Sequence, residues 1–349
     1  MRMEDRTKRQ LRHLASLTAV GALAGVVYMP FIERTSTLEA ALKFAAQGAL
    51  ITSLVFSFEI FVAQGPASEP LRRARFAVVL FTKALITTGL ILLAYGIGGL
   101  VLFHDRFEGA AALHNLARDT AFALFVALVL QFILMVRDVV GGRVLTNIIL
   151  GRYHRPLKEE RIFMFLDVSG STALAESMGG LGAYAMISRF FFDVAQETAR
   201  FGGETHEYIG DEVVVTWPLL GGPENARCLA CYFAICDRMA ARAAHYQRDF
   251  GQVPGFRVGL HGGPIVAGEC GDDKREIVYF GDTINTAARI QQACKAYDQP
   301  LLLSGDLIRR MELPPDCTAT SLGQVKLRGR EKEIEIFTVE RRANETRAG

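Results

Sequence analysis

Four apolar segments in the N-terminal part of the chain constrain its fold more than any other feature of the sequence. They occupy residues 14–32, 44–63, 76–103 and 121–136, and crossing the hydrocarbon core of a bilayer takes roughly 20 residues of helix. Tyr28-Met29-Pro30-Phe31, within the first segment, offers no small-residue cleavage site, and three more spans follow, so we expect this segment to stay in the mature protein. Residues 1–136 are therefore predicted to form an all-α transmembrane domain of four spans.

Basic residues set the expected orientation of these spans. They precede the first span, separate the second from the third and follow the fourth: Arg2, Arg6, Lys8, Arg9, Arg12, Arg72, Arg73, Arg75, Arg137 and Arg143. The positive-inside rule places such groups in the cytoplasm. The connections at residues 33–43 and 104–120 are short and mixed in charge. We therefore predict a multi-pass protein of the inner cell membrane, with the lipid bilayer as a partner and with the N-terminus and the second half of the chain in the cytoplasm.

Glu59 and Lys83 are ionisable residues inside the predicted spans. Charged groups are costly in lipid, so each is a candidate for a proton or ligand site. Both lie toward the cytoplasmic ends of their helices, where Lys83 could extend to the headgroups and Glu59 could pair with it or lie at the headgroup level itself. The second interpretation requires no function, and it is the one we favour.

The second half of the sequence is typical of a soluble domain. The whole chain has 39 Lys and Arg against 37 Asp and Glu, a balance that gives no reason to expect a nucleic-acid partner. All 6 cysteines lie in this half and are expected to be reduced in the cytosol. Cys228 and Cys231 have the spacing of half a zinc site, but no second Cys/His pair follows, so ordinary core cysteines are favoured.

The order of apolar runs and turn residues predicts the architecture of this half. Residues 137–160 form a coupling segment, residues 161–340 the soluble domain and residues 341–349 a tail. The predicted elements are a strand at 161–167, a helix at 171–200 capped by Ser or Thr hydroxyls, a hairpin at 204–217 turning at Gly210-Asp211, a helix at 224–250, a hairpin at 256–268 turning at Gly262-Gly263-Pro264, a helix at 283–296, a strand at 300–303, a helix at 306–311 and strands at 324–328 and 333–339. This mixture predicts an α+β fold with a largely antiparallel sheet.

Two carboxylates fall at strand ends of the soluble domain. Asp167 ends the first strand and Asp211 lies at the tip of the next hairpin, so neighbouring strands would bring both to one edge of the sheet. Such a pair suits Mg²⁺, which takes oxygen ligands and borrows others from water and substrate phosphates. The turn at residues 168–172 precedes a helix N-terminus, where phosphate oxygens bind well. Each feature alone more often only closes a turn, but together they predict a nucleoside triphosphate site.

A third group of polar residues lies on the helix predicted at residues 283–296. Asn285 and Arg289 are four positions apart and share one helix face. Such a pair usually lies on a solvated face, but the flanking alanines allow another surface to approach closely. The pair is therefore a candidate clamp for a charged transition state.

The order of these motifs resembles the class III nucleotidyl cyclase family, the adenylyl and guanylyl cyclases. The resemblance rests on five stretches: FLDVSGST at 165–172, YIGDE at 208–212, RVGLHGGPIVAG at 257–268, GDTINTAAR at 281–289 and LRGR at 327–330. It covers about residues 158–340, with the membrane domain outside it.

The resemblance implies a ferredoxin-like catalytic domain that works as a homodimer, with its sites between two chains. Asp167, Asp211 and the Val168 carbonyl of one chain would hold two Mg²⁺ or Mn²⁺ ions. Asn285 of the other chain would orient the ribose, and Arg289 would stabilise charge on the α-phosphate. The candidate phosphate-binding residues are Ser169, Gly170, Ser171, Thr172, Arg328 and Arg330. The implied reaction is in-line attack of the ribose 3′-hydroxyl of ATP on the α-phosphorus, which gives 3′,5′-cyclic AMP and pyrophosphate.

Base selection departs from the usual adenylyl pattern. The positions that read the base in this family hold Glu207 and Val278 here. A carboxylate at the first position is similar to guanylyl cyclases, because it accepts hydrogen bonds from guanine N1 and N2, whereas adenine presents an acceptor at N1. Val278 cannot hydrogen-bond guanine O6. Membrane-anchored bacterial members are mostly adenylyl cyclases, which places ATP first and leaves GTP, or both nucleotides, as the alternative.

Two other interpretations belong to different classes. One is a membrane sensor whose cyclase-like domain is inactive, and the presence of Asp167, Asp211, Asn285 and Arg289 together weighs against it. The other treats Gly210-Asp211-Glu212 as a diguanylate-cyclase turn. It fails because the second glycine is missing and because the Asn285/Arg289 helix is present.

Overall fold

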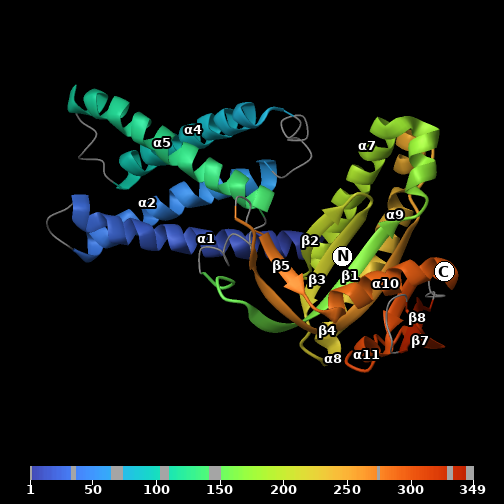
Figure 1. The fold of residues 1–349 in the computed structure, drawn as a ribbon. Helices are drawn as coiled ribbons and strands as arrows, with labels where there is room; N and C mark the ends of the chain where they lie inside the picture. The colour runs from blue at the N-terminus through green and yellow to red at the C-terminus, as the bar shows by residue number, and fades with distance from the viewer. Residues whose placement is uncertain are drawn as a thin grey trace, which may run out of the picture. The chain divides into compact units, whose positions relative to one another are not determined.

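The computed structural model describes residues 2–32, 37–63, 74–102, 110–140, 151–272, 276–327 and 333–342. The chain separates into two compact units, Met1–Thr146 and Asn147–Gly349 (Figure 1). The division falls within residues 137–160, the stretch predicted to be a coupling segment.

The N-terminal unit is all-helical. Its elements are α1 (Arg2–Ile32), α2 (Leu38–Ser57), the π-helical turn η1 (Phe58–Ala63), α4 (Phe76–Leu102) and α5 (Ala110–Val140). The Thr37 side chain caps α2 by accepting a hydrogen bond from the Ala40 amide at 3.1 Å. Each helix packs against the next one in sequence, α1 on α2, α2 on α4 and α4 on α5 (Figure 1).

Two of the four predicted spans meet the length and composition of a membrane-crossing helix. They are the continuous helix Leu38–Ala63, of 26 residues, and Phe76–Leu102, of 27 residues. The other two predicted spans fall within α1 and α5, where the apolar stretches Leu14–Met29 and Ala123–Val136 are shorter. By this measure the N-terminal region is an all-α region with two helices that are long and apolar enough to cross a bilayer.

The structure joins Glu59 and Lys83 in a buried ion pair. Lys83 Nζ on α4 lies 2.8 Å from Glu59 Oε1 on η1, and both side chains are buried. Gln131 of α5 donates to Thr87 Oγ1 at 3.0 Å and, over a longer 3.5 Å, to Glu59 Oε2. This polar cluster therefore ties three helices together, as the pairing interpretation expects.

The C-terminal unit is built on a curled β-sheet with helices on both faces (Figure 1). Its elements are β1 (Leu157–Val168), α7 (Ser171–Arg200), β2 (Glu204–Ile209), β3 (Glu212–Pro218), α8 (Gly222–Asn225), α9 (Arg227–Phe250), β4 (Phe256–Cys270), β5 (Glu276–Phe280), α10 (Asp282–Ala296), β6 (Leu301–Ser304), α11 (Gly305–Ile308), β7 (Cys317–Val325) and β8 (Ile334–Arg341).

Sheet topology confirms the predicted fold class. The strand order is β2-β3-β1-β4-β6-β8-β7, with β5 paired to β4. The pairs are antiparallel except β4 with β6. The first part, β1-α7-β2-β3-α9-β4, has the connectivity and order of the ferredoxin-like arrangement. The domain is thus α+β with a largely antiparallel sheet.

Alternation along the central strand β1 divides the core between the two faces of the sheet. Met164 and Leu166 point into a cluster that α7 and α9 cover, whereas Phe163 and Phe165 point into a second cluster that includes residues of α10. We refer to this second side as the α10 face. Burial on both faces fixes the register of β1, because a slip by one residue would exchange the two sets of side chains.

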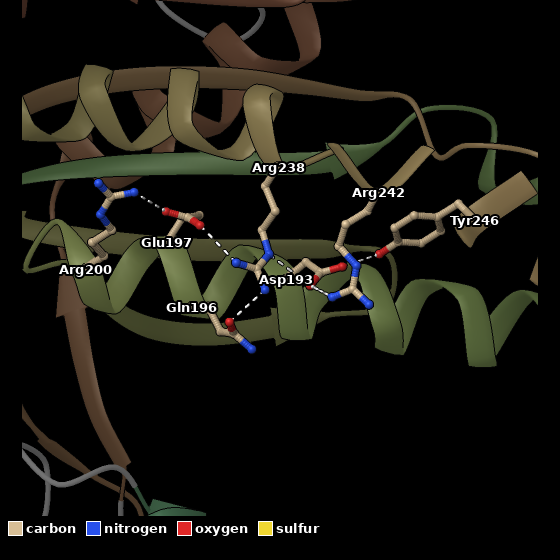
Figure 2. A network of polar contacts seen from close by, with 7 residues as sticks. All are labelled: Asp193, Gln196, Glu197, Arg200, Arg238, Arg242 and Tyr246. Carbon is tan, nitrogen blue, oxygen red and sulfur yellow. Dashed lines mark hydrogen bonds and ion pairs between the residues drawn. The ribbon is translucent and has the colours of Figure 1, made fainter. Parts of the chain in front are cut away.

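Polar contacts hold α7 against α9 on the opposite face (Figure 2). The fully buried Asp193 of α7 accepts hydrogen bonds from Arg238 Nε at 2.9 Å, Arg242 at 2.6 Å and the Tyr246 hydroxyl at 2.8 Å, all on α9. Arg238 also donates to Glu197 at 3.0 Å. A buried carboxylate with this many donors fixes how the two helices pack, because losing one partner would leave a buried charge.

The predicted hairpin at residues 256–268 is wrong. Residues 256–270 form one continuous strand, β4, and its antiparallel partner beyond them is β5. Gly262 and Gly263 provide space rather than a turn: a Cβ on Gly262 would lie 3.1 Å from Leu307 Cδ1, and one on Gly263 would lie 2.8 Å from Thr283 Oγ1. Thr283 uses that space to donate to the Pro264 carbonyl at 2.7 Å, which anchors the start of α10.

Other boundaries differ less. The helix predicted at 224–250 is interrupted at Ala226, between α8 and α9, and β7 begins at Cys317 rather than at residue 324. β1 begins at Leu157, four residues before the predicted strand, because β4 pairs with β1 from Leu157 onward, whereas the pairing with β3 begins only at Arg161.

Candidate active site

Asp167 and Asp211 come together at one end of the sheet. β1 and β3 are antiparallel neighbours in which Asp167 pairs with Glu212. Asp211 precedes β3 in the turn after Gly210, whose φ of 63° favours glycine. The Val168 amide donates to the Asp211 carbonyl at 3.2 Å, which ties the two carboxylate-bearing segments directly. The predicted convergence of the two aspartates is therefore present in the structure.

The electrostatics of this end of the sheet show a surplus of negative charge. Burial and then the Asp211 charge raise the pKa of Asp167 to about 6. Burial, followed by the charges of Asp167 and Asp211, raises the pKa of Glu212 to about 7. Carboxyl groups with raised pKa values and few compensating cations favour a bound cation, which would stabilise their ionised forms.

The donor set at this end fits a hard divalent cation. Among the described residues, no group of three or more His, Cys, Asp or Glu side chains forms a complete metal site. Mg²⁺ and Mn²⁺ do not need one, because they take carboxylate oxygens and complete their shells with water and phosphate oxygens. Asp167 and Asp211 are the residues that could hold such an ion, and both remain partly exposed.

Two residues that the sequence analysis missed contact Asp167. Gln291 of α10 is buried, and its side chain lowers the pKa of Asp167; Arg257 of β4 is the register partner of Asp167, and its positive charge lowers the same pKa. Gln291 follows Ala287 by one helical turn in the buried stripe of α10. A glutamine within such a stripe is the signal that could have identified it.

The turn after Asp167 differs in detail from the expected phosphate cradle. The Ser169 amide donates to the Gly255 carbonyl at 2.8 Å, and the Val168 amide is also used within the protein. Gly170, in the left-handed conformation with φ of 73°, is the N-cap of α7 and provides no side-chain cap, so the predicted Ser or Thr cap is wrong. The turn therefore leaves the first amides of α7, from Ser171 and Thr172, without intrahelical partners.

Asn285 and Arg289 lie on α10, on the side away from its buried stripe. Asn285 is exposed and Arg289 is half-buried. The side chain of α10 that reaches Asp167 of the same chain is Gln291. α10 packs closely on β4, because Gly259 has no side chain where it meets the α10 backbone: a Cβ there would lie 2.7 Å from the Ala287 carbonyl.

The two positions predicted to select the base are on β2 and β5. Glu207 is exposed and Val278 is half-buried. Their neighbours in sequence, His206 and Tyr279, have ring centroids 4.7 Å apart, so the two strands are brought together here. Arg328 and Arg330 lie outside the described residues.

Comparison with known proteins adds to this geometry. Residues 156–341 match the family model described as the adenylate and guanylate cyclase catalytic domain. The chain is 40% identical over 208 residues to "Adenylate cyclase 2" of Rhizobium meliloti (strain 1021), a match that spans 60% of this chain and 57% of that protein. It is 28% identical over 200 residues to "Adenylate cyclase 1" of the same organism, spanning 55% of this chain and 30% of that protein.

A solved structure is similar in fold. A bacterial light-regulated adenylyl cyclase superposes with a TM-score of 0.52 at 20% identity, over 61% of this chain and 63% of that chain. At this identity the likeness concerns the fold alone. The chain covers just over half of the first relative's length and less than a third of the second's.

Proposed function

Because the chain belongs to the family of adenylate and guanylate cyclase catalytic domains, we propose that it is a membrane-anchored adenylate cyclase that converts ATP to 3′,5′-cyclic AMP and pyrophosphate. The observation that carries the proposal is the Asp167–Asp211 pair on adjacent segments of the family's own domain, where the raised pKa of Asp167 favours a bound cation. The 40% identity to an adenylate cyclase over 208 residues supports the choice of reaction.

Asp167 and Asp211 would hold the divalent metal ions, two per site, with the Val168 carbonyl as a further ligand. When bound, such ions lower the pKa of an attacking hydroxyl and neutralise the charge of a leaving polyphosphate. The protein holds the two aspartates in place through the β1–β3 register and the hydrogen bond that the Val168 amide donates to the Asp211 carbonyl. Gln291 and Arg257 orient the Asp167 carboxylate and favour its ionised form.

The remaining residues bind and orient the nucleotide in this proposal. The amides of Ser171 and Thr172 and the Ser169 hydroxyl face the phosphates, together with Arg328 or Arg330. Asn285 orients the ribose and Arg289 stabilises charge on the α-phosphate. Asn285 is exposed, and within one chain Gln291 rather than Asn285 reaches Asp167. These two facts support a homodimer in which Asn285 and Arg289 act on the Asp167 and Asp211 of the other copy.

GTP is the alternative substrate, and a specific observation favours it. Glu207 is exposed on β2 close to β5, where a carboxylate would accept from guanine N1 and N2. Val278 supplies no hydrogen bond to either base. Similarity to an adenylate cyclase places ATP first.

The N-terminal unit is proposed to be a four-span membrane domain with the catalytic domain in the cytoplasm. Large apolar side chains are exposed on α1, α4 and α5, among them Val27, Leu85, Val101 and Phe125, and lipid would cover such surfaces. α1 and α2 also meet where Gly25 and Gly48 remove side chains from the contact, which is the packing typical of membrane helices.

The decisive experiment is an assay of the full-length protein in membranes with Mn²⁺ and equal ATP and GTP, beside the Asp167→Ala variant. Both cyclic products are quantified by mass spectrometry. Cyclic AMP that disappears in the variant supports the proposal, and cyclic GMP would transfer it to guanylate cyclase. If neither product forms, the chain is instead a membrane sensor with an inactive cyclase-like domain.

A further inference from the structure

His206 interrupts strand β2 as a β-bulge. Thr205 pairs with Val215 of β3 and Glu207 pairs with Val214, which leaves His206 as the extra residue. Val215 and Val214 belong to the hydrophobic clusters on opposite faces of the sheet. A bulge re-aims the side chains beside it, and this one allows His206 and Glu207 to share the α10 face.

The His206 ring packs on Tyr279 of β5. The ring centroids are 4.7 Å apart and the planes are tilted by 52°. Tyr279 also lies edge-on to Phe163 at 5.5 Å and under the Arg161 guanidinium at 5.1 Å. Arg161 is buried and donates to Thr216 and to Glu204, each at 3.0 Å. The Tyr279 ring is therefore held in place by His206, Phe163 and Arg161.

Backbone pairing does not connect the two strands that carry the base-selecting positions. In the part of the chain that the structure describes, β2 pairs with β3 and β5 pairs with β4, and the order β2-β3-β1-β4 lies between them. The contact between His206 and Tyr279 joins β2 to β5 across the α10 face of the curled sheet. Because Glu207 adjoins His206 and Val278 adjoins Tyr279, this contact sets how far apart the two selecting positions lie.

From this geometry we infer that His206 is a positioning residue for base selection: packed on Tyr279, its ring holds Glu207 and Val278 at the separation that decides which purine is read. The inference rests on the proposed cyclase function. His206 acts through Tyr279 and not by touching the nucleotide.

The charge states of the two rings agree with a packing role. Burial lowers the pKa of His206, and burial raises the pKa of Tyr279 to about 12. Both rings are therefore neutral near pH 7, so ring packing and not ionic attraction makes the contact.

The test uses full-length protein in membranes with His206→Leu, His206→Phe and Tyr279→Leu. For each we measure kcat and KM for ATP and the inhibition constant of GTP, with both cyclic products quantified by mass spectrometry. His206→Leu keeps a side chain of similar volume but loses the ring. It should change the ratio of the KM for ATP to the inhibition constant of GTP about threefold to tenfold, the size expected from one aromatic pair. His206→Phe should restore the ratio. The double variant with Tyr279→Leu should show little further change, because both substitutions remove the same contact.

His245→Ala, an exposed histidine on α9, is the matched control and should leave the ratio unchanged. Fluorescence of Trp217, the single tryptophan, reports whether each variant folds. If His206→Leu reduces turnover while the ratio stays constant, or if His206→Phe fails to restore it, His206 only supports the fold and the inference is overturned. A wild-type protein that forms neither cyclic product refutes the proposed function instead. If His206→Leu does not fold, Tyr279→Leu replaces it in the test. An unchanged ratio of the KM for ATP to the inhibition constant of GTP in Tyr279→Leu then overturns the inference.

Discussion

Asp167 is destabilised in its ionised form by its surroundings and is also a proposed metal ligand. It lies between a buried core and two further acids, Asp211 and Glu212. Arg257 and Gln291 offset only part of this repulsion, since the pKa of Asp167 remains raised to about 6. A site that binds cations well is thus a site that costs stability when the cations are absent.

Replacing Asp167 by Asn should separate these two effects. We expect cyclase activity to fall by about 100-fold or more, because a metal ligand is lost, while the metal-free protein becomes more stable near neutral pH by on the order of 1 kcal/mol, a value reduced for solvent screening at this partly exposed group. Melting followed by Trp217 fluorescence in chelator measures the second effect. Lower stability of Asp167→Asn in chelator would contradict the electrostatic account.

The same conflict predicts a pH dependence. Asp167 and Glu212 have folded-state pKa values of about 6 and about 7, above their ordinary values of 3.8 and 4.5. A raised carboxyl pKa favours the protonated form in the folded state, so its contribution to stability is greatest below about pH 4 and is lost as pH rises to about 7. The stability gap between Asp167→Asn and the wild type in chelator should therefore widen from pH 5 to pH 8. Saturating Mn²⁺ should stabilise the wild type more at pH 8 than at pH 5.

At the scale of elements, α10 depends on its close contact with β4. A Cβ on Gly259 would lie 2.6 Å from the Gln291 Cα and 2.7 Å from the Ala287 carbonyl, both backbone atoms of α10. Gly259→Ala should push the helix off the sheet, cost about 1–3 kcal/mol and misplace Asn285 and Arg289. Thermal melting and the KM for ATP measure the two consequences.

Gly268→Ala on the same strand is the control for this substitution. A Cβ there would meet Pro156 at an ordinary 3.5 Å, so both melting and KM should stay close to those of the wild type. Equal effects at Gly259 and Gly268 would mean that contact with α10 is not what Gly259 provides.

The buried ion pair of the N-terminal unit gives a second prediction for elements. Glu59→Gln leaves the Lys83 ammonium buried without its counter-charge, which should lower the stability of the full-length protein in nanodiscs by about 3 kcal/mol. Glu39→Gln removes the carboxylate of an exposed pair with Lys43 on α2, and its effect on stability should be much smaller than that of Glu59→Gln. The fraction that stays monodisperse after heating measures both. Combining Glu59→Leu with Lys83→Met should recover stability, and failure to do so would show that the pair is more than a packing contact.

At the scale of the whole molecule, the proposed site needs two chains. Asp167→Ala and Asn285→Ala chains should each be inactive alone, yet co-expression should restore part of the activity, up to about a quarter of the wild-type rate if chains pair at random and one of two sites in each mixed dimer is intact. Cyclic AMP formed in membranes measures the recovery. Activity that stays absent although the two chains co-purify would place all four residues in a site within one chain.

The sequence alone determined the features that depend on local pattern. Two apolar helices of membrane-crossing length, the α+β class and the strand-end positions of Asp167 and Asp211 all follow from residue periodicity and turn residues within short windows. Periodicity works at this range because a helix face and a strand face repeat every few residues whatever lies far along the chain.

Tertiary structure decided what depends on which surfaces meet. Gly262 and Gly263 looked like a turn, but they make room for α11 and α10 within one long strand. Gln291 lies close to Asp167, His206 packs on Tyr279, and Glu59 forms a buried ion pair with Lys83. Each of the last three contacts joins residues 24 or more positions apart, and strand order, sheet curvature and helix packing determine which residues meet. No local pattern encodes those quantities, because they result from burying all the apolar faces of the chain at once.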